Sequence, residues 1–216
     1  MDAPHYALDN LRLPNNTTVL HAAASDSSPD ARDFLRANYD IGSIANSFHD
    51  VNMGGLPDDP DIYATGPPCQ PSSTAGKRRY DKDPRAKLFM ETVDRIGIMK
   101  PKVAVIENSA NFVNIRGGEM HKEVIHKLSN YGYKVQSRII NTVDYGIPQW
   151  RNRLWVVAIR NDVYEAGRQP WVWPKDIVPC TLQTLLLAKD RDSSEGKTLP
   201  QGMKAATKRQ TRERER

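Results

Sequence analysis

Cys69 is the residue in this sequence best placed to act as a nucleophile. It lies in the segment Gly66-Pro67-Pro68-Cys69-Gln70-Pro71, directly after the apolar run Ile62-Tyr63-Ala64. Because the prolines fix φ, they would present the thiol in one orientation at the end of a strand. A free cysteine more often serves as a small apolar residue, so on this segment alone a buried turn cysteine is the favoured interpretation.

Two further polar clusters lie beside apolar runs that predict strands. Glu107-Asn108-Ser109 follows the run Lys102–Ile106, and Pro148–Arg153 precedes the run Leu154–Ile159. In an open α/β sheet, side chains just beyond the carboxyl ends of strands line the ligand crevice. The cysteine and the glutamate could therefore converge from distant parts of the sequence. Without the cysteine segment, the glutamate would be interpreted as an ion pair at a strand end, and the arginines as an exposed strand edge.

Strand and helix patterns alternate along the chain, and this alternation predicts an α/β fold. Apolar residues recur at helical spacing in Ala86–Ile98 and Met120–Asn130, and Ser28-Pro29-Asp30 is typical of a helix start. We expect a parallel-rich sheet with helices on both faces. Strands are predicted at Val19–Ala24, Ile41–Ile44, Ile62–Ala64, Lys102–Ile106, Tyr133–Ile140 and Leu154–Ile159, with further helical segments at His5–Leu13 and Thr181–Ala188.

Length and cysteine content narrow the class of protein. A chain of 216 residues is long enough for one α/β domain with a sizeable core. Two cysteines, Cys69 and Cys180, and no leader-like apolar stretch at the N-terminus indicate a reducing compartment. The longest apolar run, Leu154–Ile159, is too short to cross a bilayer. We expect an intracellular protein without a membrane partner, nuclear if eukaryotic and cytoplasmic if prokaryotic or viral.

The positive charge of the chain is concentrated at its C-terminus. The net charge is +5, and residues 204–216 contribute +4 of it through six basic and two acidic side chains. Residues 1–203 therefore carry only +1. Such a run is usually a solvated, disordered end and only sometimes a phosphate-binding arm. We expect a domain over residues 1–187 and a polar, basic, disordered tail over residues 188–216.

In several ordered blocks the sequence resembles the cytosine-5 DNA methyltransferase family. Pro67-Pro68-Cys69-Gln70 looks like the nucleophile loop of that family, Glu107-Asn108-Ser109 like its Glu-Asn-Val block, and Gln149-x-Arg151-x-Arg153 like its Gln-x-Arg-x-Arg block. The stretches Gly76-Lys77-Arg78 and Asp83-Pro84-Arg85 resemble the members that modify DNA. The resemblance runs from about residue 5 to about residue 187. It implies a Rossmann-like sheet and methyl transfer from S-adenosylmethionine to carbon 5 of cytosine.

The resemblance also implies a role for each block. The Cys69 thiolate would add to carbon 6 of the ring, Glu107 would hydrogen-bond ring nitrogen 3, and Arg151 would lie near oxygen 2. Arg153 would stabilise the thiolate or organise the loop that carries it. Because the target atom is stacked inside duplex DNA, the partner would be double-stranded DNA with the base flipped out. The wall of the base pocket and the support of the loop would come from Pro67, Pro68 and Gln149.

Two acidic residues match the cofactor positions of the family. Asp26 follows the second strand of the family fold and Asp50 the third, where carboxylates would bond the ribose hydroxyls and the adenine amino group. The family usually has Glu where Asp26 stands, and Asp has a shorter reach. Both residues could equally be turn or cap residues. No metal is expected.

The ends of the sequence differ from the family pattern. No Phe-x-Gly-x-Gly turn precedes Pro4-His5-Tyr6-Ala7-Leu8, and the chain stops before the region that recognises the target sequence. Ser109 also replaces the usual valine. We therefore expect the central catalytic portion of such an enzyme, with a second chain as one source of the missing regions, and its activity alone stays open. The alternatives are the RNA-modifying branch of the family, or a non-catalytic remnant that binds nucleic acid or a partner through its basic tail.

Overall fold

The computed structural model describes residue 7 and residues 17–68, 84–166 and 171–177. Cys69, the expected helices at 5–13 and 181–188, and the tail from 188 lie outside these residues, so the domain boundary at 187 stays a prediction. The described residues divide into two units. The first contains residues 17–68, 84–140, 152–166 and 171–173, and the second contains 141–151 and 174–177.

A small parallel pair of strands forms the N-terminal part of the first unit. β1 (Ala24–Ser25) pairs with β2 (Ile44–Ala45), and α2 (Pro29–Asn38) connects them. The helix begins where the sequence predicts, because the Ser28 side chain accepts a hydrogen bond from the Ala31 N–H. The predicted strand at 19–24 is shorter than expected: β1 covers only its last residue and Ser25.

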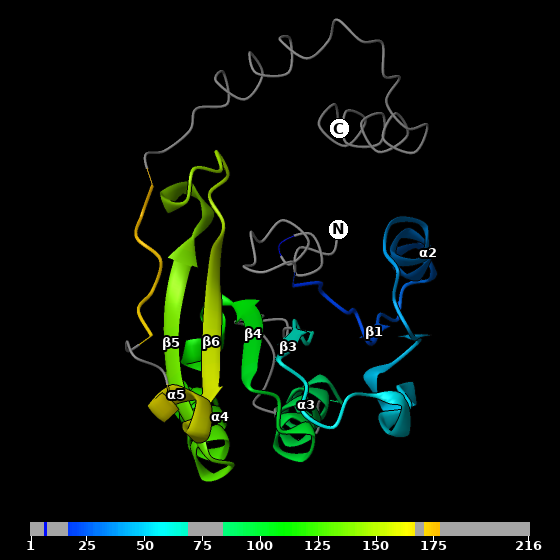
Figure 1. Cartoon of the computed structure of the whole chain (residues 1–216). Helices are drawn as coiled ribbons and strands as arrows, with labels where there is room; N and C mark the ends of the chain where they lie inside the picture. Colours follow the sequence, from blue (N-terminus) through cyan, green and yellow to red (C-terminus); the bar gives the residue numbers. More distant parts are fainter. Residues whose placement is uncertain (1–6, 8–16, 69–83, 167–170, 178–216) are drawn as a thin grey trace, which may run out of the picture. The chain divides into compact units, whose positions relative to one another are not determined.

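The main sheet has four strands in the order β3-β4-β6-β5 (Figure 1). β3 and β4 are parallel, whereas β6 runs antiparallel to β4, so the sheet is mixed rather than parallel-rich. Only residues 142–151 separate β5 from β6, which is too short for the crossover that a parallel connection needs. The strands are β3 (Ile62–Thr65), β4 (Val103–Ser109), β5 (Tyr133–Asn141) and β6 (Asn152–Arg160).

Two amphipathic helices pack against one face of this sheet. α3 (Pro84–Met99) and α4 (Glu119–Asn130) coincide closely with the helices predicted from apolar spacing. Along β4 buried and half-buried residues alternate, so every second side chain faces these helices. Fully burying one aliphatic side chain contributes about 1.5–3 kcal/mol. The core comprises Phe89, Val93, Ile96, Ala104, Ile106, Phe112, Ile115, Met120, Val124, Leu128, Tyr133, Leu154, Val156 and Ala158.

Short elements complete the described chain. They are the 3₁₀ helices η1 (Phe48–Asp50), η2 (Met53–Gly55), η4 (Ala110–Gly118) and η5 (Thr142–Asp144), and the helix α5 (Asn161–Ala166).

Among the described residues, none of the helices combines the length and the apolar character that a membrane span requires.

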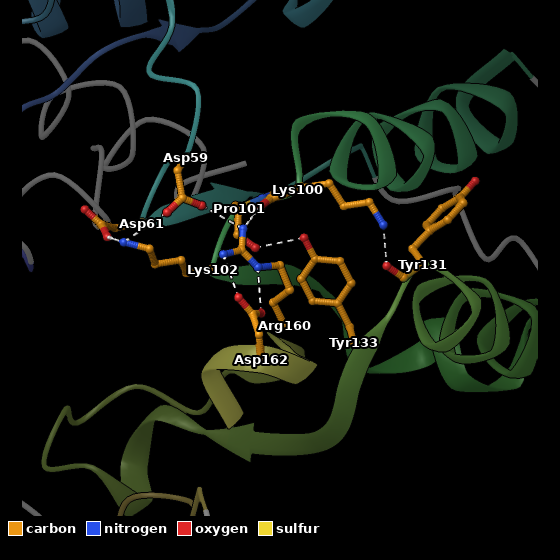
Figure 2. Close-up of polar contacts among 9 residues, drawn as sticks. All are labelled: Asp59, Asp61, Lys100, Pro101, Lys102, Tyr131, Tyr133, Arg160 and Asp162. Carbon is orange, nitrogen blue, oxygen red and sulfur yellow. Dashed lines mark hydrogen bonds and ion pairs between the residues drawn. The ribbon is translucent and has the colours of Figure 1, made fainter. Parts of the chain in front are cut away.

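A charged cluster joins the amino ends of β3 and β4 to the carboxyl end of β6 (Figure 2). Arg160 donates to the carboxylates of Asp59 and Asp162 at 2.8 Å and to the Lys100 carbonyl at 2.6 Å. Hydrogen bonds from Arg160 hold the pKa values of both aspartates below the usual range. Tyr133 donates to the Pro101 carbonyl at 2.8 Å, and burial raises the pKa of its hydroxyl to about 12. These contacts lie at the end of the strands opposite Glu107.

Candidate active site

Parallel pairing of β3 with β4 brings the Gly66-Pro67-Pro68 segment beside Glu107. Thr65 at the end of β3 pairs with Ile106 of β4. The residues that come next in the two segments, Gly66 and Glu107, therefore lie beside each other. A Cβ atom added to Gly66 would lie 3.4 Å from Glu107 Oε2. The carboxylate therefore lies against the backbone three positions before Cys69. The expected convergence of the two blocks is present as far as Pro68, and Cys69 itself lies outside the described residues.

Glu107, Asn108 and Ser109 are part of a strand and do not follow one. β4 continues to Ser109, because Glu107 pairs with Trp155 and Ser109 with Arg153 of β6. This corrects the expectation that the polar block begins after the strand. The antiparallel ladder supplies hydrogen-bond partners that the local sequence does not reveal, and these extend the strand through three polar residues.

Arg153 forms an ion pair with Glu107. Its Nε lies 2.7 Å from Glu107 Oε1, and their side chains are 26% and 32% exposed. Because Arg153 pairs directly with Ser109, it is the diagonal neighbour of Glu107 on the same face of the sheet. Arg153 also donates through its NH1 nitrogen to the Asn152 carbonyl at 2.8 Å. The arginine thus offsets the negative charge and restricts the orientation of the carboxylate.

Asn108 connects the core of the sheet to the segment that leads to Cys69. It is 3% exposed and lies on the opposite face of β4 from Glu107. Its Nδ2 donates to the Pro67 carbonyl at 3.1 Å, and its Oδ1 accepts from the Ser109 N–H at 2.8 Å. No role for Asn108 is predicted from the sequence. Strand alternation after Glu107 could have indicated it, since a buried amide needs partners.

The two prolines differ in their environment. Pro67 is buried and Pro68 is exposed. The hydrogen bond from Asn108 holds the Pro67 carbonyl, so the rigid pair leaves β3 in a fixed direction. This arrangement is compatible with the predicted role of both residues as a pocket wall, which stays a prediction.

Gln149 and Arg151 belong to the second unit, whereas Arg153 belongs to the first. The backbone of their segment is held by Asn141, whose Oδ1 accepts from the Arg151 N–H at 3.1 Å, and by Thr142, whose hydroxyl donates to the Gln149 carbonyl. Both side chains are exposed. Their predicted roles near oxygen 2 and in loop support stay predictions.

Asp26 and Asp50 follow the two strands of the small parallel pair. Since β1 and β2 are parallel, the segments that follow them leave the same edge. Asp26 Oδ1 accepts from the Ser28 N–H at 2.8 Å, so this residue also has the turn role considered as its alternative. Asp50 ends η1. Both residues are exposed.

The chemistry of these two carboxylates fits S-adenosylmethionine. The ribose hydroxyls and the adenine amino group of that cofactor are hydrogen-bond donors, and carboxylates are acceptors. Exposure leaves both aspartates accessible to a ligand. Within the described part of the chain, no group of three His, Cys, Asp or Glu side chains could hold a metal ion.

Comparison with known proteins identifies type II methyltransferases among the relatives of this chain. The family model for C-5 cytosine-specific DNA methylase matches residues 9–214. Type II methyltransferase M.HhaI from Haemophilus parahaemolyticus is 35% identical over 142 residues, which cover 66% of this chain and 42% of that protein. Type II methyltransferase M.NgoBI from Neisseria gonorrhoeae is 30% identical over 162 residues, covering 74% and 49%. The chain thus spans less than half the length of these relatives.

Solved structures share the fold. The Dnmt2 methyltransferase of S. pombe superposes with a TM-score of 0.54 at 21% identity, over 91% of this chain and 54% of that one. The Entamoeba histolytica methyltransferase EhMeth gives a TM-score of 0.57 at 22% identity, over 80% and 53%. The predicted α/β, Rossmann-like fold of S-adenosylmethionine-dependent methyltransferases is confirmed. With the family model matching nearly its whole length, the chain belongs to the C-5 cytosine-specific DNA methylase family.

Proposed function

We propose that the protein transfers a methyl group from S-adenosylmethionine to carbon 5 of cytosine in double-stranded DNA through a covalent Cys69 adduct. The observation that carries the proposal is the position of Glu107, whose carboxylate lies against Gly66 at the start of the segment leading to Cys69. Membership of the DNA methylase family supports DNA as the substrate. An enzyme of this kind acts where DNA is, in a nucleus or a prokaryotic cytoplasm.

The covalent step makes carbon 5 reactive. Cytosine is aromatic and electron-poor, so carbon 5 is a poor nucleophile until the ring is activated. The Cys69 thiolate forms a bond to carbon 6, and carbon 5 becomes an enamine-like nucleophile. Carbon 5 then takes the methyl group and loses its proton, and the thiolate leaves carbon 6 so that the ring is restored. When bound, S-adenosylmethionine supplies an electrophilic methyl group on its sulfonium.

An acidic and a basic side chain stabilise the activated ring. Addition at carbon 6 places negative charge on nitrogen 3 and oxygen 2, so a hydrogen bond donated to nitrogen 3 by the Glu107 carboxyl, in its protonated form, and a contact from Arg151 to oxygen 2 lower the barrier. The 2.7 Å ion pair supports a role for Arg153 in orienting Glu107. Pro67 and Pro68 bound the pocket that receives the flipped base. Gln149 supports the loop that carries the nucleophile.

Asp26 and Asp50 hold the adenosine part of the cofactor in this proposal. Their exposed carboxylates follow the parallel strands β1 and β2 and accept hydrogen bonds from the ribose hydroxyls and the adenine amino group. One oxygen of Asp26 already accepts from the Ser28 N–H, which fixes the direction of the carboxylate.

Trapping on a fluorinated substrate tests the proposal. Fluorine at carbon 5 cannot leave as a proton, so a duplex in which 5-fluorocytosine replaces cytosine should stay covalently bound after methyl transfer. We expect an adduct that survives denaturing electrophoresis and maps to the peptide containing Cys69. Cys69→Ser should abolish it, whereas Cys180→Ser, the matched control at the other cysteine, should not.

The outcomes separate the alternatives. An adduct that persists in Cys69→Ser would overturn the assignment of the nucleophile. A matched single-stranded RNA with the same replacement tests the RNA-modifying alternative, and preferential trapping of RNA would contradict DNA as the substrate. Wild-type protein that traps neither nucleic acid would contradict the proposed activity of this chain.

A further inference from the structure

Helix α3 contacts both sequence neighbours of Asp50, His49 through its side chain and Val51 through its carbonyl. On one side, Glu91 Oε2 lies 3.2 Å from His49 Nε2. On the other, the NH2 nitrogen of Arg95 donates to the Val51 carbonyl at 3.3 Å. His49 and Val51 are the immediate neighbours of Asp50 in the sequence. The carboxylate assigned to the cofactor therefore lies between two points of attachment to one helix.

Arg95 makes two further contacts with the same segment. Its guanidinium carbon lies 5.5 Å from the centroid of the Phe48 ring, within the range of a cation–π interaction. Its NH2 nitrogen lies 2.8 Å from the sulfur of Met53. Three residues of the stretch 48–53 thus depend on one guanidinium. A planar group with several donors can hold such a stretch more rigidly than a point charge.

The helix that makes these contacts is anchored in the core. Phe89, Val93 and Ile96 of α3 are 2%, 0% and 0% exposed. Glu91 and Arg95 are four positions apart, so they lie on the same face of the helix. The attachment therefore connects an exposed turn to one of the most buried elements of the described fold. Movement of the Asp50 carboxylate is limited by the rigidity of α3.

We propose that Glu91 and Arg95 are positioning residues for the cofactor, which hold η1 so that the Asp50 carboxylate meets the adenosine group. The inference rests on the proposed function, because it presumes that Asp50 binds the cofactor. A binding group that is held in place beforehand loses less conformational freedom when its ligand arrives. The two residues touch no ligand themselves and act through the His49 side chain and the Val51 carbonyl.

Exposure distinguishes this role from a general contribution to stability. The side chains of His49 and Glu91 are 52% and 33% exposed, and exposed ion pairs contribute little to global stability. Loss of these contacts should therefore loosen residues 48–53 locally while leaving the melting temperature nearly unchanged. The Asp50 N–H, bonded to the Ser47 carbonyl at 3.0 Å, and the Val51 N–H, bonded to the Phe48 carbonyl at 3.4 Å, report that loosening.

The experiment compares four variants and one control in the full chain. Glu91→Ala and Arg95→Met remove the contacts, whereas Glu91→Gln keeps an acceptor for His49 and Arg95→Lys keeps the charge. Lys87→Ala is the control, because Lys87 is 79% exposed and pairs with Glu91 at 3.4 Å within α3 itself. The measurements are calorimetric affinity for S-adenosylmethionine, amide hydrogen exchange over residues 47–53, melting temperature, and kcat for methyl transfer at saturating cofactor.

We expect Glu91→Ala and Arg95→Met each to weaken cofactor affinity about tenfold and to speed exchange at Asp50 and Val51, with kcat and melting temperature nearly unchanged. Glu91→Gln should recover most of the affinity, and Lys87→Ala should behave as wild type. The inference alone would be overturned if the wild type binds the cofactor and both truncations bind it with unchanged affinity. It would also be overturned if amide exchange becomes faster without any loss of affinity. Wild-type protein that binds no cofactor would instead overturn the cofactor part of the proposed function, and the inference would fall with it.

Discussion

Arg153 Nε lies 2.7 Å from Glu107 Oε1 across the diagonal of the β4–β6 ladder. The pair joins a residue of the Glu-Asn-Ser block to the last residue of the Gln-x-Arg-x-Arg block, which lies far along the chain. One strand pair therefore fixes the position of Arg153, the last residue of its block, relative to Glu107. A site on paired strands is held more precisely than one on a loop, because both backbones are hydrogen-bonded.

Replacement of the Glu107 carboxyl by an amide should affect the rate far more than binding. If Glu107 stabilises charge that appears only on addition of the thiolate, Glu107→Gln should lower single-turnover methyl transfer by roughly 10²-fold or more, with DNA affinity nearly unchanged. Transfer of labelled methyl groups gives the rate, and fluorescence anisotropy gives the affinity. An equal loss of rate and affinity would make Glu107 a structural residue.

Removal of its partner should have a smaller effect of the same kind. Arg153→Ala leaves the Glu107 carboxylate without its 2.7 Å contact and should lower the rate about tenfold, because a misoriented group is less effective in the transition state. Arg138→Ala, which removes a positive charge from an exposed position on β5, should leave the rate unchanged. A comparable loss in Arg138→Ala would point to net charge and away from the orientation of Glu107.

Asn108 should control how firmly the nucleophile segment is held. Asn108→Ala leaves the Pro67 carbonyl without its 3.1 Å hydrogen bond inside the protein, which should cost about 1–3 kcal/mol of stability and slow adduct formation on 5-fluorocytosine DNA. Asn111→Ala, which removes an exposed amide that accepts from Asn114 at 3.2 Å, is the control for a lost surface contact. Denaturant unfolding and trapping rates measure the two effects. Trapping at the wild-type rate would separate Asn108 from the nucleophile.

Local patterns predicted the helices well because those patterns coincide with burial. The apolar spacing in 86–98 and 120–130 corresponds to the sides of α3 and α4 that pack in the core, and Ser28 caps α2 as its position indicated. These features need no information from distant residues. The convergence of Glu107 with the segment before Cys69 was also predictable, since both lie at the carboxyl ends of parallel strands.

Features set by distant partners could not be read from the sequence. The strand character of Glu107–Ser109 depends on pairing with β6, and the length of β1 depends on a partner strand of only two residues. The contact between His49 and Glu91 spans 42 positions. A polar residue offers no local signal of which distant group it will meet, so the attachments of Arg153 and Arg95 emerge only in the folded chain.

Gly97 on α3 lies where a larger side chain should destabilise the fold. A Cβ atom there would lie 2.7 Å from two carbons of the Tyr131 ring, and that ring is held by a 2.5 Å hydrogen bond to Asp94. Alanine gains up to about 1 kcal/mol of helix propensity, whereas overpacking costs about 1–3 kcal/mol. Gly97→Ala should therefore lower the free energy of unfolding, by up to about 2 kcal/mol after the full gain in helix propensity is subtracted.

Denaturant unfolding tests this steric explanation. Ile98→Ala, at a position that is 74% exposed on the same helix, should change the free energy of unfolding by less than about 0.5 kcal/mol. The penalty of Gly97→Ala should also shrink when Tyr131→Ala removes the ring. A penalty of the same size without the ring would locate the strain elsewhere.

Acid should destabilise the fold through His121. This residue of α4 lies 3.0 Å from the Ser137 hydroxyl of β5, and burial lowers its pKa below the usual 6.5. The His121 imidazole therefore binds a proton more readily in the unfolded chain than in the folded chain. The stabilising contribution is complete above about pH 6.5 and is lost as the pH falls from there through the folded pKa. One proton changes the free energy of unfolding by at most about 1.4 kcal/mol per pH unit.

His121→Gln should remove this dependence while keeping a group that can bond Ser137. The free energy of unfolding, measured in denaturant at pH 7.5, 6.5 and 5.5 or nearby values, should then decline less steeply in the variant than in the wild type. His126→Gln, at an exposed position of the same helix, should keep the wild-type slope. An equally flattened slope in both variants would show that any imidazole in α4 contributes to the pH dependence. The burial of His121 between α4 and β5 would then not be its cause.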